Sequence, residues 1–412
     1  MEKKKVMILG AANGQLPFIK ICKDNGYYVI VVSIKGNYPG FEFADKSYYY
    51  DTRDKESILK AAKHEGIDAI LTDQTDASVQ TVAYVSEKLG LRGIGYNTSL
   101  KFTNKYEMRK AAKDAGVPVP EFEEFNNVSD AVVFAEKIGF PLMLKPVDSS
   151  GSRGVSKIDN IDELKDRFSQ AQKFSSNGYV ILEQFITGIP FIVNGFAIDG
   201  EYYNLDIANK SYFKSIDLFI TRRCIFESAC YVDNEIKKTV LKTNKQLVEG
   251  IGLNAGITHA DYLYNEKEKK AYLVEIAARG GGTFISSNIT PMVTGFNSNK
   301  ALIDYIVEGI ITKLERPLDK VSGYACFALP EGVIESISGI EELSNMKSIK
   351  MLHLNDLYVG KRVSGLTHDA EKYGPIIFLT ESIPEAEEVI KTIEKTLDIR
   401  VITDDGIKGI IW

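Results

Sequence analysis

The feature that most constrains the fold is a short apolar run that carries a lysine and continues into a loop of small residues. It spans residues 140–155 and reads FPLMLKPVDSSGSRGV. Pro141 opens the run, and Pro146 ends it directly after Lys145. The serines and glycines of the loop offer hydroxyls, N–H groups and close backbone approach, which a phosphate chain requires. A strand followed by an ordinary solvent-exposed turn fits the same residues equally well.

Length and charge narrow the class of protein. The chain has 412 residues, of which 44% are hydrophobic and 26% charged, with a formal net charge of −6. Two or three domains with ample core are expected, and the charge argues against a general nucleic-acid binder. No apolar run has the length of a membrane span, and the first residues predict a strand rather than a signal peptide. Four scattered cysteines without metal-site spacing favour a reducing cytoplasm.

The first ninety residues predict an α/β sheet of doubly wound type. Residues 5–34 form a βαβ opening, and the same rhythm of strands and helices continues to about residue 89. The glycines after the first strand are spaced Gly-x-x-x-Gly, which favours a small-molecule or phosphate loop over a dinucleotide site. Asp73 and Asp76 follow a strand at 69–72, where open sheets bind ligands, although Asp76 fits a helix N-cap equally well.

Residues 99–251 predict a mixed region of helices and strands. A helix over 103–115 places Lys105 and Arg109 on one face, a pattern typical of a solvated basic surface. A strand near 179–188 carries Glu183, and alternating runs from 191 to 229 predict antiparallel strands.

Two later runs predict a hairpin with facing carboxylates. Residues 257–264 and 271–277 are joined by a charged turn, and a turn centred near residue 268 places Asp261 opposite Glu275 and His259 opposite Ala277. Two facing carboxylates repel each other, and a bound Mg²⁺ ion relieves that repulsion. A register shift of one residue, which turns one carboxylate to solvent, is the alternative. Arg279 and a run of three glycines follow, and a smaller α/β unit closes the chain.

Together these segments resemble the ATP-grasp superfamily over nearly the whole chain. The resemblance rests on ordered motifs at 104–109, 144–146, 149–155, 182–186, 259–262, 274–276 and on Arg279. It implies an α/β, ATP-grasp fold with an amino-terminal doubly wound parallel-sheet domain and a small carboxy-terminal α/β domain. The implied domains are 1–98, 99–314 with a lid at about 118–186, and 315–412.

The resemblance also implies roles for individual residues. ATP-binding residues would be Lys105, Lys145, Ser150, Gly151, Ser152, Gly154, Glu183, Gln184, Phe185 and Ile186. Asp261 and Glu275 would hold Mg²⁺, with Mn²⁺ as an alternative ion. Arg279 and Arg153 would be catalytic. Gly10, Asn13, Gly14, Asp73, Asp76 and Arg222 are the candidates to bind substrate.

Two positions depart from the family pattern. Pro190 stands where many relatives have a glutamate that meets the ribose, and Ala277 stands where the second metal strand often has asparagine. The Arg-Gly-Gly-Gly run at 279–282 and the closing unit look most like the amino-acid ligase and carbamoyl-phosphate-synthase-like branches.

The resemblance implies an ATP-dependent carboxylate–amine ligase that forms an amide through an acyl phosphate. Its partners would be a small-molecule carboxylate and an amine, with a homodimer as an option. One alternative is a purine-biosynthesis ligase similar to phosphoribosylamine–glycine ligase or carboxyaminoimidazole ribonucleotide synthetase. Another, of a different class, is a nucleotide-binding protein without turnover.

Overall fold

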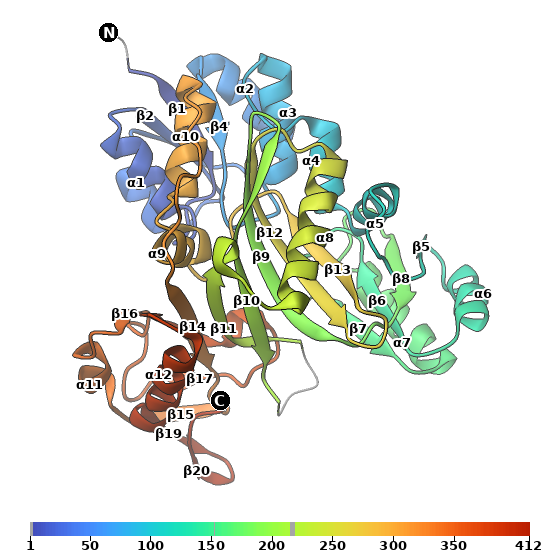
Figure 1. The fold of residues 1–412 in the computed structure, drawn as a ribbon, viewed down its shortest axis with the longest axis vertical. Helices are drawn as coiled ribbons and strands as arrows, with labels where there is room; N and C mark the ends of the chain where they lie inside the picture. Colours follow the sequence, from blue (N-terminus) through green and yellow to red (C-terminus); the bar gives the residue numbers. More distant parts are fainter. Residues whose placement is uncertain (1–2, 152, 215–218) are drawn as a thin grey trace.

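The computed structural model describes residues 3–151, 153–214 and 219–412. Its amino-terminal part is a parallel sheet of order β3-β2-β1-β4 with helices on both faces (Figure 1). Helix α1 packs beside the much later α10 (Ser298–Glu308) on one face, while α2 and α3 cover the other. Burial on both faces explains the continuous apolar strands and confirms the predicted doubly wound opening. The elements are β1 (Lys5–Leu9), α1 (Leu16–Asp24), β2 (Tyr28–Val32), η1 (Pro39–Phe43), β3 (Lys46–Tyr48), α2 (Lys55–Glu65), β4 (Ala69–Leu71) and α3 (Val79–Leu89).

A second lobe, the lid, is an antiparallel sheet of order β5-β8-β6-β7. Side chains alternate across its strands, so Leu142 and Leu144 join the core under α6 and α7, while Met143 and Lys145 point the other way, into a cavity. Two short helices, α4 (Tyr96–Thr103) and α5 (Lys105–Asp114), precede it. The lid elements are β5 (Phe122–Phe125), α6 (Val128–Ile138), β6 (Leu142–Pro146), β7 (Ser156–Ile158), α7 (Ile161–Gln172) and β8 (Val180–Gln184).

The centre of the molecule is an eight-stranded sheet of order β13-β12-β9-β10-β11-β14-β18-β16. Helix α8 packs on one face together with α5, and η3, α9 and α10 pack on the other. The elements are β9 (Ile189–Ile198), β10 (Glu201–Tyr212), β11 (Thr221–Ser228), η2 (Ala229–Tyr231), α8 (Glu235–Ile251), β12 (Gly256–Asn265), β13 (Lys270–Ala277), η3 (Ile285–Ile289, a π-helix) and α9 (Thr290–Thr294).

The carboxy-terminal segment contributes to two sheets. Strands β14, β18 and β16 extend the central sheet from β11, and a small antiparallel sheet of order β17-β15-β19-β20 packs with them around a common core (Figure 1). The boundary expected near residue 315 therefore does not separate two sheets. The elements are β14 (Val321–Phe327), β15 (Gly332–Ser338), α11 (Ile340–Ser344), β16 (Ile349–Leu352), β17 (Arg362–Val363), η4 (Asp369–Glu371), β18 (Tyr373–Thr380), α12 (Ile383–Thr396), β19 (Asp398–Thr403) and β20 (Gly406–Lys408).

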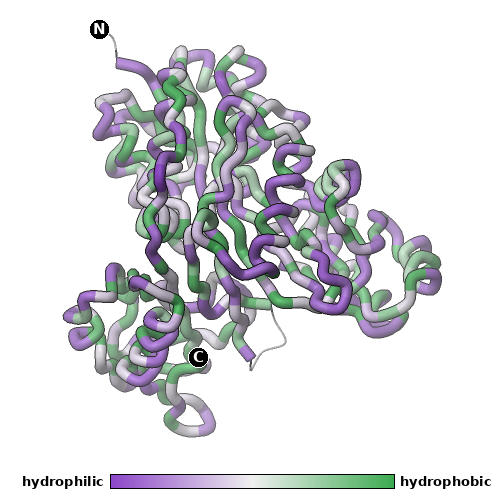
Figure 2. Tube along the Cα trace, in the orientation of Figure 1, coloured by the Kyte–Doolittle hydropathy of each residue, from purple (hydrophilic) through white to green (hydrophobic). Residues whose placement is uncertain are grey.

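Hydropathy follows this layering. Figure 2 shows hydrophilic and hydrophobic residues alternating along the outer helices, as expected for helices that bury one face against a sheet. Across the described ranges, no helix is long and apolar enough to cross a membrane.

Candidate functional site

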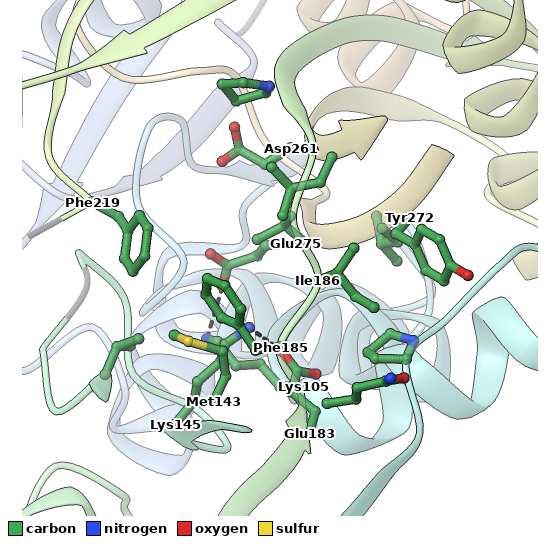
Figure 3. Close-up of a pocket in the computed structure, with 18 of the residues that line it drawn as sticks. Lys105, Met143, Lys145, Glu183, Phe185, Ile186, Phe219, Asp261, Tyr272 and Glu275 are labelled. Atoms are coloured by element: carbon green, nitrogen blue, oxygen red, sulfur yellow. Dashed lines mark hydrogen bonds and ion pairs between the residues drawn. The ribbon is translucent and has the colours of Figure 1, made fainter. Parts of the chain in front are cut away.

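A cavity of about 450 Å³ lies between the inner face of the lid and the central sheet. This volume is in the usual range for small-molecule sites. Figure 3 shows Lys145, Glu183 and Lys105 gathered on one side of the cavity, with Glu275 and then Asp261 beyond them. The predicted site residues that line it are Lys105, Lys145, Gly151, Glu183, Gln184, Phe185, Ile186, Asp261 and Glu275.

The two cations of α5 are buried, so the interpretation of this helix as a solvated basic face is wrong. Asn104 caps α5 by accepting hydrogen bonds from the N–H groups of Tyr106 and Glu107, at 2.9 and 3.1 Å. This cap directs the helix so that Lys105 and Arg109, which share a face, both line the cavity. Arg109 is 1% exposed.

Glu183 lies between two buried cations. Arg109 donates from Nε to Oε2 of Glu183 at 2.9 Å, and Lys145 donates to Oε1 of the same carboxylate. Burial alone would raise the pKa of Glu183, but Arg109 and Lys145 outweigh it and hold the pKa at about 2. The carboxylate that the resemblance assigns to ATP binding therefore forms ion pairs with two cations.

The hairpin prediction is confirmed: Asp261 pairs with Glu275, and His259 pairs with Ala277. The register shifts by one residue just beyond Asp261, where Tyr262 pairs with Leu273, so Val274 is an extra residue on β13. Such a bulge changes the direction in which the neighbouring side chains point, and it leaves a backbone group without a partner in the hydrogen bonding between the strands. Arg109 Nη2 donates to the carbonyl of Val274 at 2.7 Å, which ties the bulge to α5.

Each facing carboxylate has its own lysine. Lys105 Nζ lies 2.8 Å from Oε1 of Glu275, and Lys210 Nζ lies 2.8 Å from Oδ1 of Asp261. In the structure these lysines relieve the repulsion between the carboxylates, and the assignment of Asp261 and Glu275 to a metal ion stays a prediction. Burial alone would raise the pKa of Glu275, but Lys105 outweighs it and holds the pKa at about 2.

Lys210 is a site residue that sequence reasoning missed. It lies on β10, two strands from Asp261, with a side chain that is 12% exposed. Residue 208 lies across β9 from Asp261, and the two-residue period of a strand places residue 210 on the same face. A single lysine in a strand of alternating polarity belongs to no recognisable motif. Finding Lys210 would have required the order of the strands in the sheet, which the sequence alone does not give.

Arg279 is held by Asp76 of the amino-terminal sheet. Its Nε and Nη2 donate to the two carboxylate oxygens of Asp76 at 2.9 and 2.8 Å. The next residue, Gly280, donates its N–H to Asp73 at 2.8 Å, and a Cβ at Gly280 would collide with Asp73 and Ser286. Asp73 is fully buried and positions the Gly280 backbone, and its role in substrate binding stays a prediction.

A buried polar row runs behind the hairpin. Nδ1 of His259 and Oδ1 of Asn194 lie 2.8 Å apart, and Asn194 donates to Oδ1 of Asp206 at 2.6 Å. Burial lowers the pKa of His259 to about 4, which makes this ring neutral at pH 7. Burial raises the pKa of Asp206 to about 7, and its Oδ2 has no partner within the described part of the chain.

Several predicted residues lie away from the cavity lining. Arg153 is exposed, and its Nε donates to the carbonyl of Ser150 at 3.1 Å. Ser150 and Gly154 belong to the same loop without lining the cavity, and Ser152 lies outside the described residues.

The remaining substrate candidates also differ in placement. Gly10 lies at the end of β1 and lines neither cavity, whereas Asn13 and Gly14 line a second cavity. Arg222 forms an ion pair with Glu394 of α12 and lines neither cavity, and its role in substrate binding stays a prediction.

Comparison with known proteins shows which proteins this chain resembles. Residues 104–304 match the family model described as carbamoyl-phosphate synthase L chain, ATP binding domain. The crystal structure of an L-amino acid ligase from Bacillus licheniformis superimposes with a TM-score of 0.80 at 22% identity, over 97% of this chain and 99% of that one. The chain is thus similar to ATP-grasp proteins in sequence over residues 104–304 and in fold over nearly its whole length.

Other ATP-grasp relatives carry the names of ligases. Alanine–anticapsin ligase of Bacillus subtilis (strain 168) is 27% identical over 320 residues, which are 71% of this chain and 65% of that protein. This chain therefore spans about two thirds of that relative's length. An L-arginine-specific L-amino acid ligase of Bacillus subtilis is 24% identical over 377 residues, 88% of each chain. Phosphoribosylglycinamide synthetase from Anaerococcus prevotii has a TM-score of 0.74 at 17% identity, over 97% of this chain and 99% of that one.

The buried cation–carboxylate cluster leads to a stability prediction for Glu183→Gln. Removing one charge leaves Arg109 and Lys145 buried without compensation, which costs about 3–5 kcal/mol of unfolding free energy. Because the folded-state pKa of Glu183 lies below its ordinary value of 4.5, its contribution is complete above pH 4.5 and is lost as the pH falls toward 2. Urea unfolding at pH 7 and pH 3 should show a large gap between variant and wild type at pH 7 and a smaller one at pH 3. Glu136→Gln, which alters an exposed carboxylate on α6, is the control and should match wild type.

Asp206→Asn should have the opposite pH dependence. The folded-state pKa of about 7 exceeds the ordinary value of 3.8, so the folded state binds the extra proton and wild-type stability falls as the pH rises from about 4 to 7. An amide has the same shape and no charge, so the variant should equal wild type near pH 4 and exceed it by a few kcal/mol at pH 8. Urea unfolding at the two pH values measures this, and an equal difference at both would contradict the assignment.

Proposed function

We propose that the chain is an ATP-dependent carboxylate–amine ligase that forms an amide through an acyl phosphate. The observation that carries the proposal is the mixed lining of the first cavity. Met143, Phe185 and Ile186 give it apolar wall, and its charged lining includes Lys105, Lys145, Asp261 and Glu275. A nucleotide requires this combination, with apolar surface for the base and charges for the phosphates.

The charged lining fits a divalent cation. Asp261 and Glu275 present hard oxygen ligands from paired strands, and Mg²⁺ is commonly held by one or two carboxylates together with substrate phosphates. Among the described residues, no group of three or more histidine, cysteine, aspartate or glutamate side chains converges, so phosphate oxygens would complete the coordination. When bound, Mg²⁺, or Mn²⁺ in its place, neutralises phosphate charge. Lys105 and Lys210, freed from the carboxylates, would then face phosphate oxygens.

The proposed reaction has two steps. An oxygen of the substrate carboxylate attacks the γ-phosphorus of ATP, the bond to the bridging oxygen breaks, and ADP leaves. The nitrogen of the amine then attacks the acyl carbon, the bond from that carbon to the phosphate oxygen breaks, and the nitrogen loses a proton as phosphate departs. The chain contributes mainly positioning and charge. Arg279, oriented by Asp76, would steady the transferred phosphoryl group.

Glu275→Gln tests the charged lining. Loss of this carboxylate should lower kcat for ADP release about 100-fold or more, because it removes a ligand that acts in the transition state. The thermal unfolding midpoint should fall because the buried Lys105 loses its partner, so activity is compared at a temperature where both proteins are folded, and the dissociation constant of ATP should no longer depend on added Mg²⁺. Glu266→Gln, which changes an exposed turn residue of the same hairpin, is the matched control. Full activity in Glu275→Gln would remove the metal assignment.

A substrate matrix tests the function as a whole. Phosphate release from Mg-ATP should require both a carboxylate and an amine, and L-amino acids should serve in both roles. Phosphoribosylamine with glycine is one cell of the matrix, and activity in that cell alone would indicate the purine-biosynthesis alternative. Tight ATP binding without phosphate release in any cell would indicate a nucleotide-binding protein without turnover.

A further inference from the structure

A second cavity of about 250 Å³ lies where three parts of the chain meet. The loop after β1 contributes Asn13, and the end of the glycine run contributes Thr283 and Phe284. The carboxy-terminal unit contributes the remaining wall, including His353 and Lys372. The walls thus combine amides, a hydroxyl, an aromatic ring, an imidazole and a cation, a mixture that suits a small polar ligand.

Backbone strain gathers at this cavity. Five non-glycine residues of the described chain have positive φ angles, and two of them, Asp199 and Lys269, lie in hairpin turns, where this conformation is common. The other three, Gln74, Thr283 and Phe284, have φ angles of 55°, 57° and 58°, and all three line the second cavity. The π-helix η3 begins at the next residue. Strained backbone and π-helical turns persist mainly at functional sites, because the surrounding structure must hold them in place.

The cavity wall is continuous with the segment that carries Arg279. Thr283 is four residues beyond Arg279, and Gly280 between them is fixed by Asp73. Gln74, the neighbour of Asp73, donates from Nε2 to the carbonyl of Gly14 at 3.0 Å, and both residues line the cavity. A ligand in this cavity therefore lies against the backbone that supports the arginine.

The cation of the cavity is held by a replaceable partner. Lys372 Nζ lies 2.6 Å from Oδ1 of Asp369, and the lysine side chain is 11% exposed while that of Asp369 is 46% exposed. A nearly buried ammonium group beside a half-exposed carboxylate can exchange that carboxylate for one on a ligand. The desolvated lysine gains a charge-assisted hydrogen bond in either state.

We propose that the second cavity binds the amine substrate as an α-amino acid, with its α-carboxylate on Lys372 in place of Asp369. The α-amino group then points toward the Arg279–Gly282 segment, where the acyl phosphate of the first step would form. This inference rests on the proposed ligase function and assigns the amine position to the class of free amino acids.

Two variants with opposite expected effects on the KM for the amino acid test the site. The probes are the L-amino acid that wild type uses best as the amine in the substrate matrix, and the carboxamide of that amino acid. Lys372→Met should raise the KM for the amino acid about 10- to 100-fold, as expected for loss of a hydrogen bond to a charged group, and leave the KM for the carboxamide unchanged. Asp369→Asn should lower the KM for the amino acid, because Lys372 loses its competing partner. The KM for ATP should stay constant in both.

Lys361→Met is the matched control. Lys361 lies in the same unit, pairs with Asp356 at 2.9 Å and is outside the cavity, so its loss should leave the KM for the amino acid unchanged. A purely structural role for the Lys372–Asp369 pair would make both pair variants behave alike. Equal increases of KM in Lys372→Met and Asp369→Asn would therefore overturn the inference.

Hydroxylamine separates failure of this inference from failure of the ligase function. It traps an acyl phosphate as a hydroxamate and has no carboxylate for Lys372, so Lys372→Met should form hydroxamate at the wild-type rate. Hydroxamate formation together with an unchanged KM for the amino acid in Lys372→Met would overturn the inference alone. A wild-type protein that forms no hydroxamate with any carboxylate of the matrix would overturn the ligase function and, with it, this inference.

Discussion

The candidate site depends on one buried carboxylate. Glu183 compensates Arg109 and Lys145, and these three residues come from the lid strands β8 and β6 and from helix α5. Each unpaired charge would be costly away from water, so the three elements hold one relative position or lose this compensation. Arg109 also reaches the bulge at Val274, which sets the aim of Glu275. Orientation of the lid and placement of a candidate metal ligand thus follow from the same guanidinium group.

The charged side chains of the first cavity form ion pairs, and a bound nucleotide could exchange the partners of those pairs. Lys105 and Lys210 neutralise Glu275 and Asp261, so the protein carries no large uncompensated charge in this part of the cavity. MgATP would bring a dication and several phosphate oxygens, which match the carboxylates and the lysines respectively. Exchange of partners then replaces one set of charge interactions with another, and little net charge is left buried without compensation at any stage. In the second cavity, Lys372 and Asp369 form a similar ion pair, which the carboxylate of a ligand would rearrange.

The sequence predicts the local part of this arrangement and misses the part set by strand order. The pairing of Asp261 with Glu275 follows from turn position and strand period, although the bulge that brings the two into register leaves no separate signal. The sequence does not reveal Lys210 because its partner is 51 residues away on another strand, and it does not reveal the pairing of Arg222 with Glu394, which follows 172 residues later. Helix periodicity placed Lys105 and Arg109 together correctly, but it could not show that the lid buries both. Sequence motifs identify the main residues of the site. The ion-pair partners of those residues depend on packing between segments that are distant in the sequence.

The glycine run at 280–282 would join the two cavities in the proposed reaction. Gly280 lies against Asp73 and Ser286, and a Cβ at Gly281 would come within 2.7 Å of Nδ1 of His259, so the run packs directly on the hairpin and on the amino-terminal sheet. Arg279 stands at one end of this run, paired with Asp76, and the strained residues Thr283 and Phe284 stand at the other. A side chain at Gly280 or Gly281 would collide with these neighbours and displace the segment that carries Arg279. In the proposed reaction, the close packing of Gly280 and Gly281 would therefore allow an acid activated beside Arg279 to meet an amine held beside Phe284.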